Sequence, residues 1–203
     1  MSLPVVVTVH CSQEVQSWAT ITWDNAFSKN NRVPFYVVDT VNWSHMVDAL
    51  KFKYFQETGR RLTDDNLSHL CEWSESIANN GTTSKFPVSC IPGEKAFRGT
   101  VNSDPNDRPI TWSQFCKEPL PQRTFTFWDW FYAAMKLTKD KLRDQWKKDL
   151  IVGFISRRQT EEKLMNSTPG TFLLRFSDSV IGEFRSSHPA RYDGMFYTLN
   201  LLN

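Results

Sequence analysis

The chain has 203 residues, of which 40% are hydrophobic and 23% charged, which is typical of a globular protein rather than a disordered one. Its formal net charge of +2 disfavours binding to nucleic acid through bulk charge alone, so any contact with DNA has to be local. The sequence contains no run of about 18 apolar residues and opens without a secretory signal. We therefore predict neither a membrane span nor secretion.

The first part of the chain is rich in β-branched and aromatic residues. Residues 4–9 and 18–23, "PVVVTV" and "WATITW", are predicted to form strands joined by a polar hairpin connection. The following run, residues 24–35, contains Asn, Ser and Pro and is expected to be a loop.

From Trp43 onward the apolar residues recur at helical spacing. Residues 43–54 place five apolar side chains on one face, which predicts an amphipathic helix that ends near Gly59. A second helix is predicted to begin at Thr63, whose side chain can cap it. Leu62 and Leu67 occupy the two positions of a hydrophobic staple around this start.

Residues 73–94 break this order, because they are polar, have no period and are longer than most loops within a domain. Order returns at residues 110–115, "ITWSQF". Residues 125–137 then place an aromatic stripe on one helical face, formed by Trp128, Phe131, Tyr132 and Met135. We interpret this stripe as core, and we expect a short helix after Thr138.

The last predicted unit is a helix followed by a strand. Ser156 and Gln159 have the spacing of a capping box, which predicts a helix that runs to about Met165. A turn containing Pro169 and Gly170 leads to the strand "TFLLRF", residues 171–176.

This strand carries Arg175 in its middle. A guanidinium cannot shed its charge, and burying it unpaired is very costly, so Arg175 either faces water or meets an anion. By strand alternation Arg175 shares a face with Ser177 and Ser179, opposite the face of Phe172, Leu174 and Phe176. A planar fork of donors with two hydroxyl groups suits phosphate better than carboxylate.

The helix before this strand adds to the attraction for an anion. Arg157 and Arg158 lie in its first turn, where free backbone N–H groups also favour negative charge. The alternative is that all three arginines are solvated surface residues. The ordered set of capped helix, Pro-Gly turn, strand arginine and two serines favours the phosphate site.

The sequence gives little support to an enzyme. It has no G-x-S-x-G, H-E-x-x-H, P-loop or G-x-G-x-x-G motif, and its four histidines form no metal-spaced cluster. The four cysteines, which are scattered without a C-x-x-C pair, are expected to be free thiols. We therefore predict a non-enzymatic protein without a metal or cofactor.

The ordered set around Arg175 resembles the start of a Src-homology-2 phosphotyrosine-binding domain. "GTFLLRFSDS", residues 170–179, is similar to the version found in STAT proteins, the signal transducers and activators of transcription. "LPVVVTVH", "ATITWDNAF" and "RVPF" resemble the last strands of the STAT DNA-binding domain. Residues 127–156 resemble the end of the STAT linker domain, and the resemblance as a whole covers residues 3–72 and 95–182.

The resemblance implies a role for several residues. Arg175 corresponds to the arginine that forks onto the phosphate, Ser177 and Ser179 take the supporting hydroxyl positions, and Arg157 takes that of a basic residue at the helix start.

A second set of residues is implied to contact DNA. Asn25, in "WDNAF", matches the asparagine that STAT proteins direct at DNA bases, a role that suits a side chain able both to donate and to accept. Lys29 and Arg32 are weaker candidates for contacts to the DNA phosphates.

The implied fold class is α+β with four parts. Residues 1–40 are expected to be the C-terminal strands of an immunoglobulin-like β-barrel DNA-binding domain, and residues 41–148 a mostly helical linker domain. Residues 149–182 are expected to hold the first helix and strand of a Src-homology-2 domain, followed by a divergent tail at 183–203. The linker contains an unmatched insertion at residues 73–94.

The implied function is that of a STAT-type signal transducer and DNA-binding transcription factor. Its partners are phosphotyrosine segments of receptors and of another STAT chain, palindromic DNA sites, and a Janus-type tyrosine kinase upstream. The expected location is the cytoplasm, with the nucleus on activation. Because both binding modules are incomplete, we expect both activities to be impaired. The alternative is a cytosolic phosphotyrosine-interaction module, or a competitor of full-length STAT, that acts without DNA.

The two unmatched segments suggest a common origin. Gly182-Glu183-Phe184 can be encoded by a splice-donor consensus, and residues 86–93 by a pyrimidine-rich tract ending in an acceptor consensus. Our hypothesis is that both segments are translated introns, which predicts that they do not pack on the rest of the protein.

Overall fold

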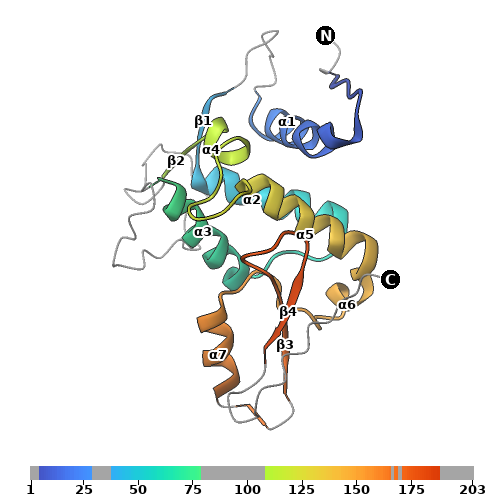
Figure 1. Ribbon diagram of the computed structural model, residues 1–203, viewed down its shortest axis with the longest axis vertical. Helices are drawn as coiled ribbons and strands as arrows, with labels where there is room; N and C mark the ends of the chain where they lie inside the picture. Colours follow the sequence, from blue (N-terminus) through green and yellow to red (C-terminus); the bar gives the residue numbers. More distant parts are fainter. Residues whose placement is uncertain (1–4, 29–37, 79–107, 166, 169–170, 188–203) are drawn as a thin grey trace, which may run out of the picture.

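The computed structural model describes residues 5–28, 38–78, 108–165, 167–168 and 171–187 (Figure 1). Its described part is mixed α+β and mostly helical, with two small antiparallel hairpins, which confirms the broad fold class. The helices are α1 (Glu14–Phe27), α2 (Trp43–Thr58), α3 (Asp64–Ala78), α4 (Trp112–Cys116), α5 (Phe127–Lys141), α6 (Arg143–Lys147) and α7 (Arg157–Met165). A short 3₁₀ helix, Cys11–Gln13, precedes α1. The hairpins pair β1 (Thr40–Asn42) with β2 (Pro109–Thr111) and β3 (Leu173–Phe176) with β4 (Phe184–Ser187).

The expected barrel strand at residues 18–23 is wrong, because this stretch lies within α1. Residues 5–9, described without a strand assignment, are exposed. A helical pattern was present in the sequence, since Val15, Ala19, Trp23 and Phe27 follow one another at intervals of four residues and all contribute to the core. Burial of this stripe therefore outweighs the strand preference of the β-branched residues between its members.

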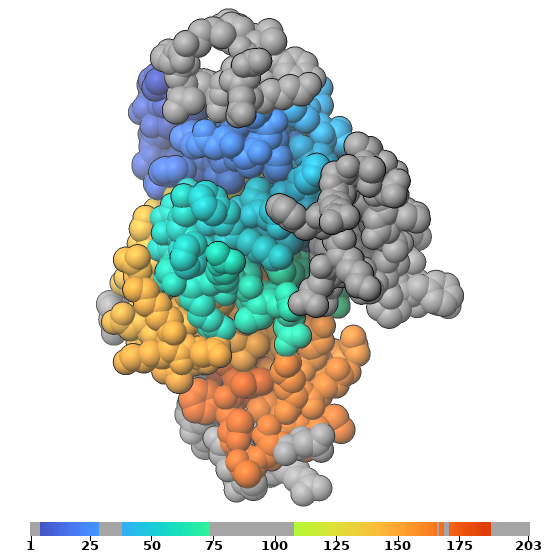
Figure 2. Space-filling view, turned by 180° about the vertical axis from the view of Figure 1, so that it is seen from behind, coloured from blue at the N-terminus to red at the C-terminus, as the bar shows by residue number. Residues whose placement is uncertain are grey.

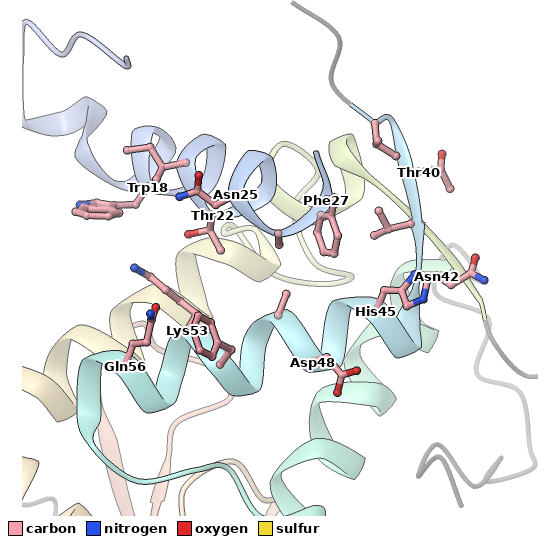
Figure 3. Close-up of a pocket in the computed structure, with 16 residues that line it drawn as sticks. Trp18, Thr22, Asn25, Phe27, Thr40, Asn42, His45, Asp48, Lys53 and Gln56 are labelled. Atoms are coloured by element: carbon pink, nitrogen blue, oxygen red, sulfur yellow. The ribbon is translucent and has the colours of Figure 1, made fainter. Parts of the chain in front are cut away.

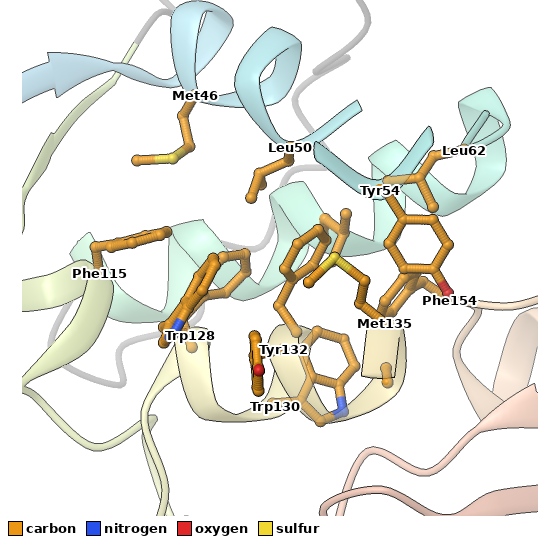
Figure 4. Packing of buried hydrophobic residues seen from close by; sticks show 14 of the residues in the cluster. Met46, Leu50, Tyr54, Leu62, Phe115, Trp128, Trp130, Tyr132, Met135 and Phe154 are labelled. Atoms are coloured by element: carbon orange, nitrogen blue, oxygen red, sulfur yellow. The ribbon is translucent and has the colours of Figure 1, made fainter. Parts of the chain in front are cut away.

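The main core lies between α2 and α5 (Figure 4). The predicted aromatic stripe of α5 is buried, with Trp128 and Phe131 fully enclosed and Tyr132 8% exposed. From α2, Tyr54 packs edge-on against Phe131, and its hydroxyl lies 2.9 Å from Thr138 Oγ1. This arrangement confirms that the stripe is core.

The predicted helix ends are also confirmed. Gly59 ends α2 in the left-handed conformation at φ 82°, which favours glycine. At the start of α3, the Thr63 hydroxyl accepts a hydrogen bond from the backbone N–H of Asn66 at 3.4 Å. Leu62 and Leu67, on the two sides of this cap, are both buried.

An aromatic row joins the helical core to the β3–β4 hairpin. Phe154 is fully buried, and its ring lies 5.1 Å from that of Trp130 on α5 and 4.5 Å from that of Phe176 on β3. Phe176 in turn lies 4.7 Å from Phe184 on β4. These rings belong to a single core cluster, so helices α2 and α5 and the hairpin form one packed body.

The presence of strand β4 contradicts part of the prediction that the two unmatched segments do not pack. Residues beyond Gly182 were expected not to pack, yet Phe184 is 6% exposed and β4 pairs in register with β3. The prediction is therefore wrong for residues 183–187, and the first residues of the other unmatched segment, 73–78, continue helix α3. Residues 79–94 and 188–203 lie outside the described part of the chain.

The expectation of four free thiols is also wrong. Cys71, on α3, is disulfide-bonded, whereas Cys11 and Cys116 are free.

Candidate anion-binding site

Strand β3 holds Arg175 between two neighbouring segments. On one side it faces Arg185 of β4 in the antiparallel register. On the other side a parallel bridge joins it to Gly153, in the segment that leads into α7. In Figure 1 the hairpin and α7 lie side by side at the end of the molecule opposite α1, and Figure 2 shows the same end from behind. Arg175 is thus at the centre of the hairpin, and the whole residue is only 8% exposed.

The guanidinium of Arg175 points inward, toward the chain just before α7. Its Nη1 donates to the carboxylate of Asp178 at 2.8 Å and to the carbonyls of Phe176 and Ile155 at 3.2 and 3.5 Å. Its Nε is buried without a hydrogen-bond partner in the described part of the structure. A buried unpaired donor on a permanent cation is costly, so this edge of the guanidinium is suited to receive an anion.

Asp178 is the centre of the network around Arg175. Its Oδ2 accepts from Arg175, while its Oδ1 lies 3.0 Å from Nε2 of His69 on α3. Its backbone carbonyl accepts from Nε of Arg123 at 2.9 Å. None of Asp178, His69 and Arg123 was predicted from the sequence to belong to this site. Asp178 follows Arg175 by only three residues in the sequence, which was an indication that the two could pair.

His69, on helix α3, is buried. It is 3% exposed, and its Nδ1 lies 3.4 Å from the carboxylate of Glu72. Burial opposes protonation of the ring, but hydrogen bonds and charge from Asp178 and Glu72 outweigh this and raise the pKa of His69 above its usual value. A histidine–carboxylate contact therefore connects helix α3 to the loop that follows β3.

The two serines lie in this loop, which begins directly after β3. Ser177 is 1% exposed, its carbonyl accepts from Trp130 Nε1 at 2.8 Å, and its hydroxyl accepts from the backbone N–H of Val180 at 3.2 Å. Ser179 is exposed, and its hydroxyl lies 3.5 Å from that of Ser177. The structure therefore brings both serines into the loop beside Arg175, where Ser177 also supports the turn.

Arg157 and Arg158 occupy the first turn of α7, as predicted, and the capping box is present. The Ser156 hydroxyl accepts from the backbone N–H of Gln159 at 3.2 Å, and the Gln159 side chain accepts from the backbone N–H of Ser156 at 3.0 Å. Both arginines are exposed and pair along the helix, with Glu161 and Glu162 respectively, each at 2.7 Å. In this structure neither arginine is part of the hydrogen-bond network around Arg175.

Asn25, which was expected to contact DNA, lies at the other end of the molecule (Figure 1). Asn25 is exposed on α1 at the edge of a cavity of about 840 Å³ between α1, β1 and α2. Figure 3 shows its side chain beside Thr22, with Lys53 and His45 on the opposite helix. Lys29 and Arg32 lie outside the described residues.

The described ranges contain neither a metal-binding cluster nor a membrane-spanning helix. No group of three His, Cys, Asp or Glu side chains there is arranged to hold a metal ion. None of the described helices combines the length and the apolar character needed to cross a membrane.

Comparison with known proteins identifies the family. The model of the signal transducer and activator of transcription linker domain matches residues 30–90 and 89–131, which together are half of the chain. The model of the SH2 domain matches residues 150–192, the region that contains Arg175, Asp178 and β4. The chain therefore belongs to the STAT family, whose members are non-enzymatic transcription factors.

Individual relatives agree with this assignment. The chain is 46% identical over 184 residues to the signal transducer and transcription activator of Drosophila melanogaster, covering 90% of the chain and 21% of that protein. It is 38% identical over 183 residues to the protein of the same name in Anopheles gambiae, covering 90% and 22%. It is 42% identical over 193 residues to human signal transducer and activator of transcription 6, covering 94% and 20%. The chain thus spans about a fifth of the length of these relatives.

Proposed function

We propose that Arg175 is the phosphate anchor of a phosphotyrosine-binding site. The observation that carries the proposal is its inward-pointing guanidinium, with a buried and unpaired Nε and an internal carboxylate on Nη1. Ser177 and Ser179 supply hydroxyl groups from the adjoining loop, and Arg157 supplies a further cation from the first turn of α7. For Arg157 to take part, it has to exchange Glu161 for the ligand, which is inexpensive for an exposed pair.

The wider function follows from family membership and is proposed for the protein to which these residues belong. Phosphotyrosine segments of receptors recruit it, a Janus-type kinase phosphorylates it, and two phosphorylated chains pair through the Arg175 site. The dimer then binds palindromic DNA, to which Asn25, Lys29 and Arg32 contribute. The location is cytoplasmic, and nuclear on activation. We further propose that the 203 residues alone have both activities in weakened form.

The domain division proposed above assigns residues 1–40 to the DNA-binding part, 41–148 to the linker, with 73–94 as its insertion, and 149–182 to the SH2 part. The match of the SH2 model to residue 192 supports extending the last part through β4, because β4 pairs directly with β3.

A fluorescence titration of the chain with a phosphotyrosine peptide tests the phosphate site. We expect weak, saturable binding that requires the phosphate and is lost in Arg175→Ala, since deleting one partner of a buried charged contact costs several kcal/mol. Binding of micromolar or tighter affinity that is lost in Arg175→Ala would contradict the proposed impairment. Binding that is equally strong in Arg175→Ala would refute the site itself.

The two arginines of α7 provide a matched comparison in the same assay. Arg157→Ala should weaken phosphopeptide binding, and Arg158→Ala should leave it unchanged. The two side chains are alike in exposure, 73% and 75%, and in pairing, so bulk charge alone predicts equal effects.

The second candidate function is a cytosolic phosphotyrosine-interaction module, or a competitor of full-length STAT, without DNA binding. It is favoured by the position of Asn25 on helix α1, where the resemblance had led us to expect strands of a DNA-binding barrel. An electrophoretic mobility-shift assay with a palindromic STAT site distinguishes the two. A shift that is lost in Asn25→Ala supports DNA binding, and capture of a phosphorylated STAT chain without a shift supports the module.

A further inference from the structure

The Nε2 atom of His69 has two partners that it cannot bind at the same time. It lies 3.0 Å from Asp178 Oδ1 and 3.1 Å from Nε1 of Trp73. An indole nitrogen only donates and a carboxylate oxygen only accepts. Nε2 therefore donates to Asp178 when it carries a proton, and accepts from Trp73 when it does not.

Asp178 transmits this choice to Arg175, because its second oxygen is bound to the guanidinium at 2.8 Å. We propose that His69, a residue of the linker, is a positioning residue for phosphate at Arg175 and sets, through Asp178, the orientation and the charge of the site. The proposal rests on the proposed function of Arg175 as the phosphate anchor. It makes anion binding in the SH2 part of the chain dependent on a linker side chain.

The charge of the network gives the direction of the effect. Arg175 and Asp178 cancel, so the three residues carry one net positive charge when His69 is protonated and none when it is neutral. The charged ring always carries a proton on Nε2, so it also holds Asp178 by one oxygen and weakens its competition with phosphate for Arg175, whereas the neutral ring does so only when its proton is on Nε2. A phosphate should therefore bind more tightly when His69 is charged.

Other charged groups also face His69 or its partners. Glu72 approaches Nδ1 from α3 itself, and Arg123, from the segment between α4 and α5, lies over the Trp73 ring and donates to the Asp178 carbonyl. The rings of Trp73 and Trp130 close the remaining sides. Glu72 and Arg123 are opposite in sign, so the proton on His69 decides the balance. Because Asp178 and Glu72 raise the pKa of His69 despite its burial, the charged form persists above the usual range of histidine.

Nuclear magnetic resonance of the whole chain tests the coupling without a ligand. The Nε–H signal of Arg175, assigned from its loss in Arg175→Lys, should shift with pH at the midpoint measured on the His69 ring. It should not shift in His69→Gln, which can still donate to Asp178 but cannot titrate. An Arg175 signal that is indifferent to the His69 titration overturns the proposal.

Binding of a phosphotyrosine peptide, measured by fluorescence anisotropy from pH 6 to 8.5, tests the consequence. The ratio of affinities between the wild-type chain and His69→Phe cancels the ionisation of the phosphate itself. We expect wild type to bind roughly three- to tenfold more tightly at pH 6, from one screened unit charge near the ligand, and this advantage should shrink as pH rises through the midpoint measured on the His69 ring. His45→Phe, which changes a histidine of the α1–α2 cavity, should match wild type throughout.

The two experiments distinguish failure of the phosphate site at Arg175 from failure of the role of His69. A wild-type chain that binds no phosphopeptide refutes the proposed function of Arg175, whereas the resonance titration still decides whether His69 controls the guanidinium. An affinity ratio that is flat across the pH range overturns the role of His69 even if Arg175 is essential for binding. If His69→Phe does not fold, His69→Gln decides the same point, because it should bind with a ratio to wild type that changes with pH.

Discussion

Phe154 is the residue that most directly joins the linker helices to the β3–β4 hairpin, and Phe154→Ala tests whether the two parts are one cooperative unit. Its ring is fully buried and lies within 5.8 Å of the rings of Trp130, Phe131, Phe176 and Tyr54. Truncation removes the contacts with all four rings and leaves a cavity. Phe→Ala changes in cores cost about 3–5 kcal/mol.

The upper part of that range is expected, because the surroundings of Phe154 have little freedom to collapse. Asn66, itself fully buried, donates from Nδ2 to the carbonyls of Val152 and Phe154 at 2.8 and 3.1 Å and fixes the backbone there. For a chain of this size the loss corresponds to a fall in melting temperature of roughly 6–20 °C.

Urea unfolding followed by tryptophan fluorescence and far-UV circular dichroism measures the effect. Both probes should move to the same lower midpoint, because α5 and the hairpin lose a shared core residue. Phe172→Ala is the matched control: the residue is 52% exposed and lies just before β3, and its truncation should cost about 1 kcal/mol or less. Equal effects of the two variants, or a second transition that appears only in circular dichroism, would refute the single-unit reasoning.

Three further predictions concern single side chains. Gly153→Ala should lower the unfolding midpoint by the equivalent of about 1–3 kcal/mol, since φ is +93° and a Cβ atom would lie 3.0 Å from the Trp146 ring; a stable variant with an unchanged midpoint would contradict this. Alkylation at pH 8 followed by mass spectrometry should label exposed Cys11 and not Cys116, because burial raises the pKa of the Cys116 thiol to about 12; equal labelling of folded protein would be inconsistent with that burial. Because the pKa of His69 is higher in the folded than in the unfolded protein, its protonation stabilises the fold. This contribution is complete below the unfolded pKa near 6.5 and is lost as pH rises through the folded pKa, so the difference in free energy of unfolding between wild type and His69→Phe should shrink over that range in chemical denaturation. A difference that grows with pH would contradict this prediction.

Helix ends could be predicted from the sequence where a few neighbouring residues determine them. The helix start at Ser156 and the end of α2 at Gly59 depend on caps that are complete within a few residues, and both are present. The strand prediction for residues 18–23 was wrong because a strand pattern and a helix pattern coincide in this region. Alternating β-branched residues suggested a strand, while the four-residue spacing from Val15 to Phe27 is the one that meets the core.

The neighbours of Arg175 could not be predicted in the same way. Strand alternation places Arg175 and Ser177 on one face, but it does not show that a histidine 109 residues away reaches Asp178. That contact depends on how α3 packs against the hairpin, which in turn depends on the row of rings from Trp130 to Phe176. Long-range packing of this kind leaves no spacing in the sequence, so His69 had the pattern of an ordinary polar helix residue.

The loop after β3 is held mainly by donors from the linker, and this limits how the site can respond to a ligand. Trp130 on α5 binds the carbonyl of Ser177, and Arg123 binds the carbonyl of Asp178, so the main chain of the loop is fixed at two successive residues. Both contacts end at backbone carbonyls, so they hold the main chain of the loop without using the Asp178 carboxylate. An anion at Arg175 therefore has only side chains to rearrange, and chiefly the carboxylate of Asp178. Because the other oxygen of this carboxylate contacts His69, we expect displacement of Asp178 from Arg175 by phosphate to change the His69 contact on helix α3 as well.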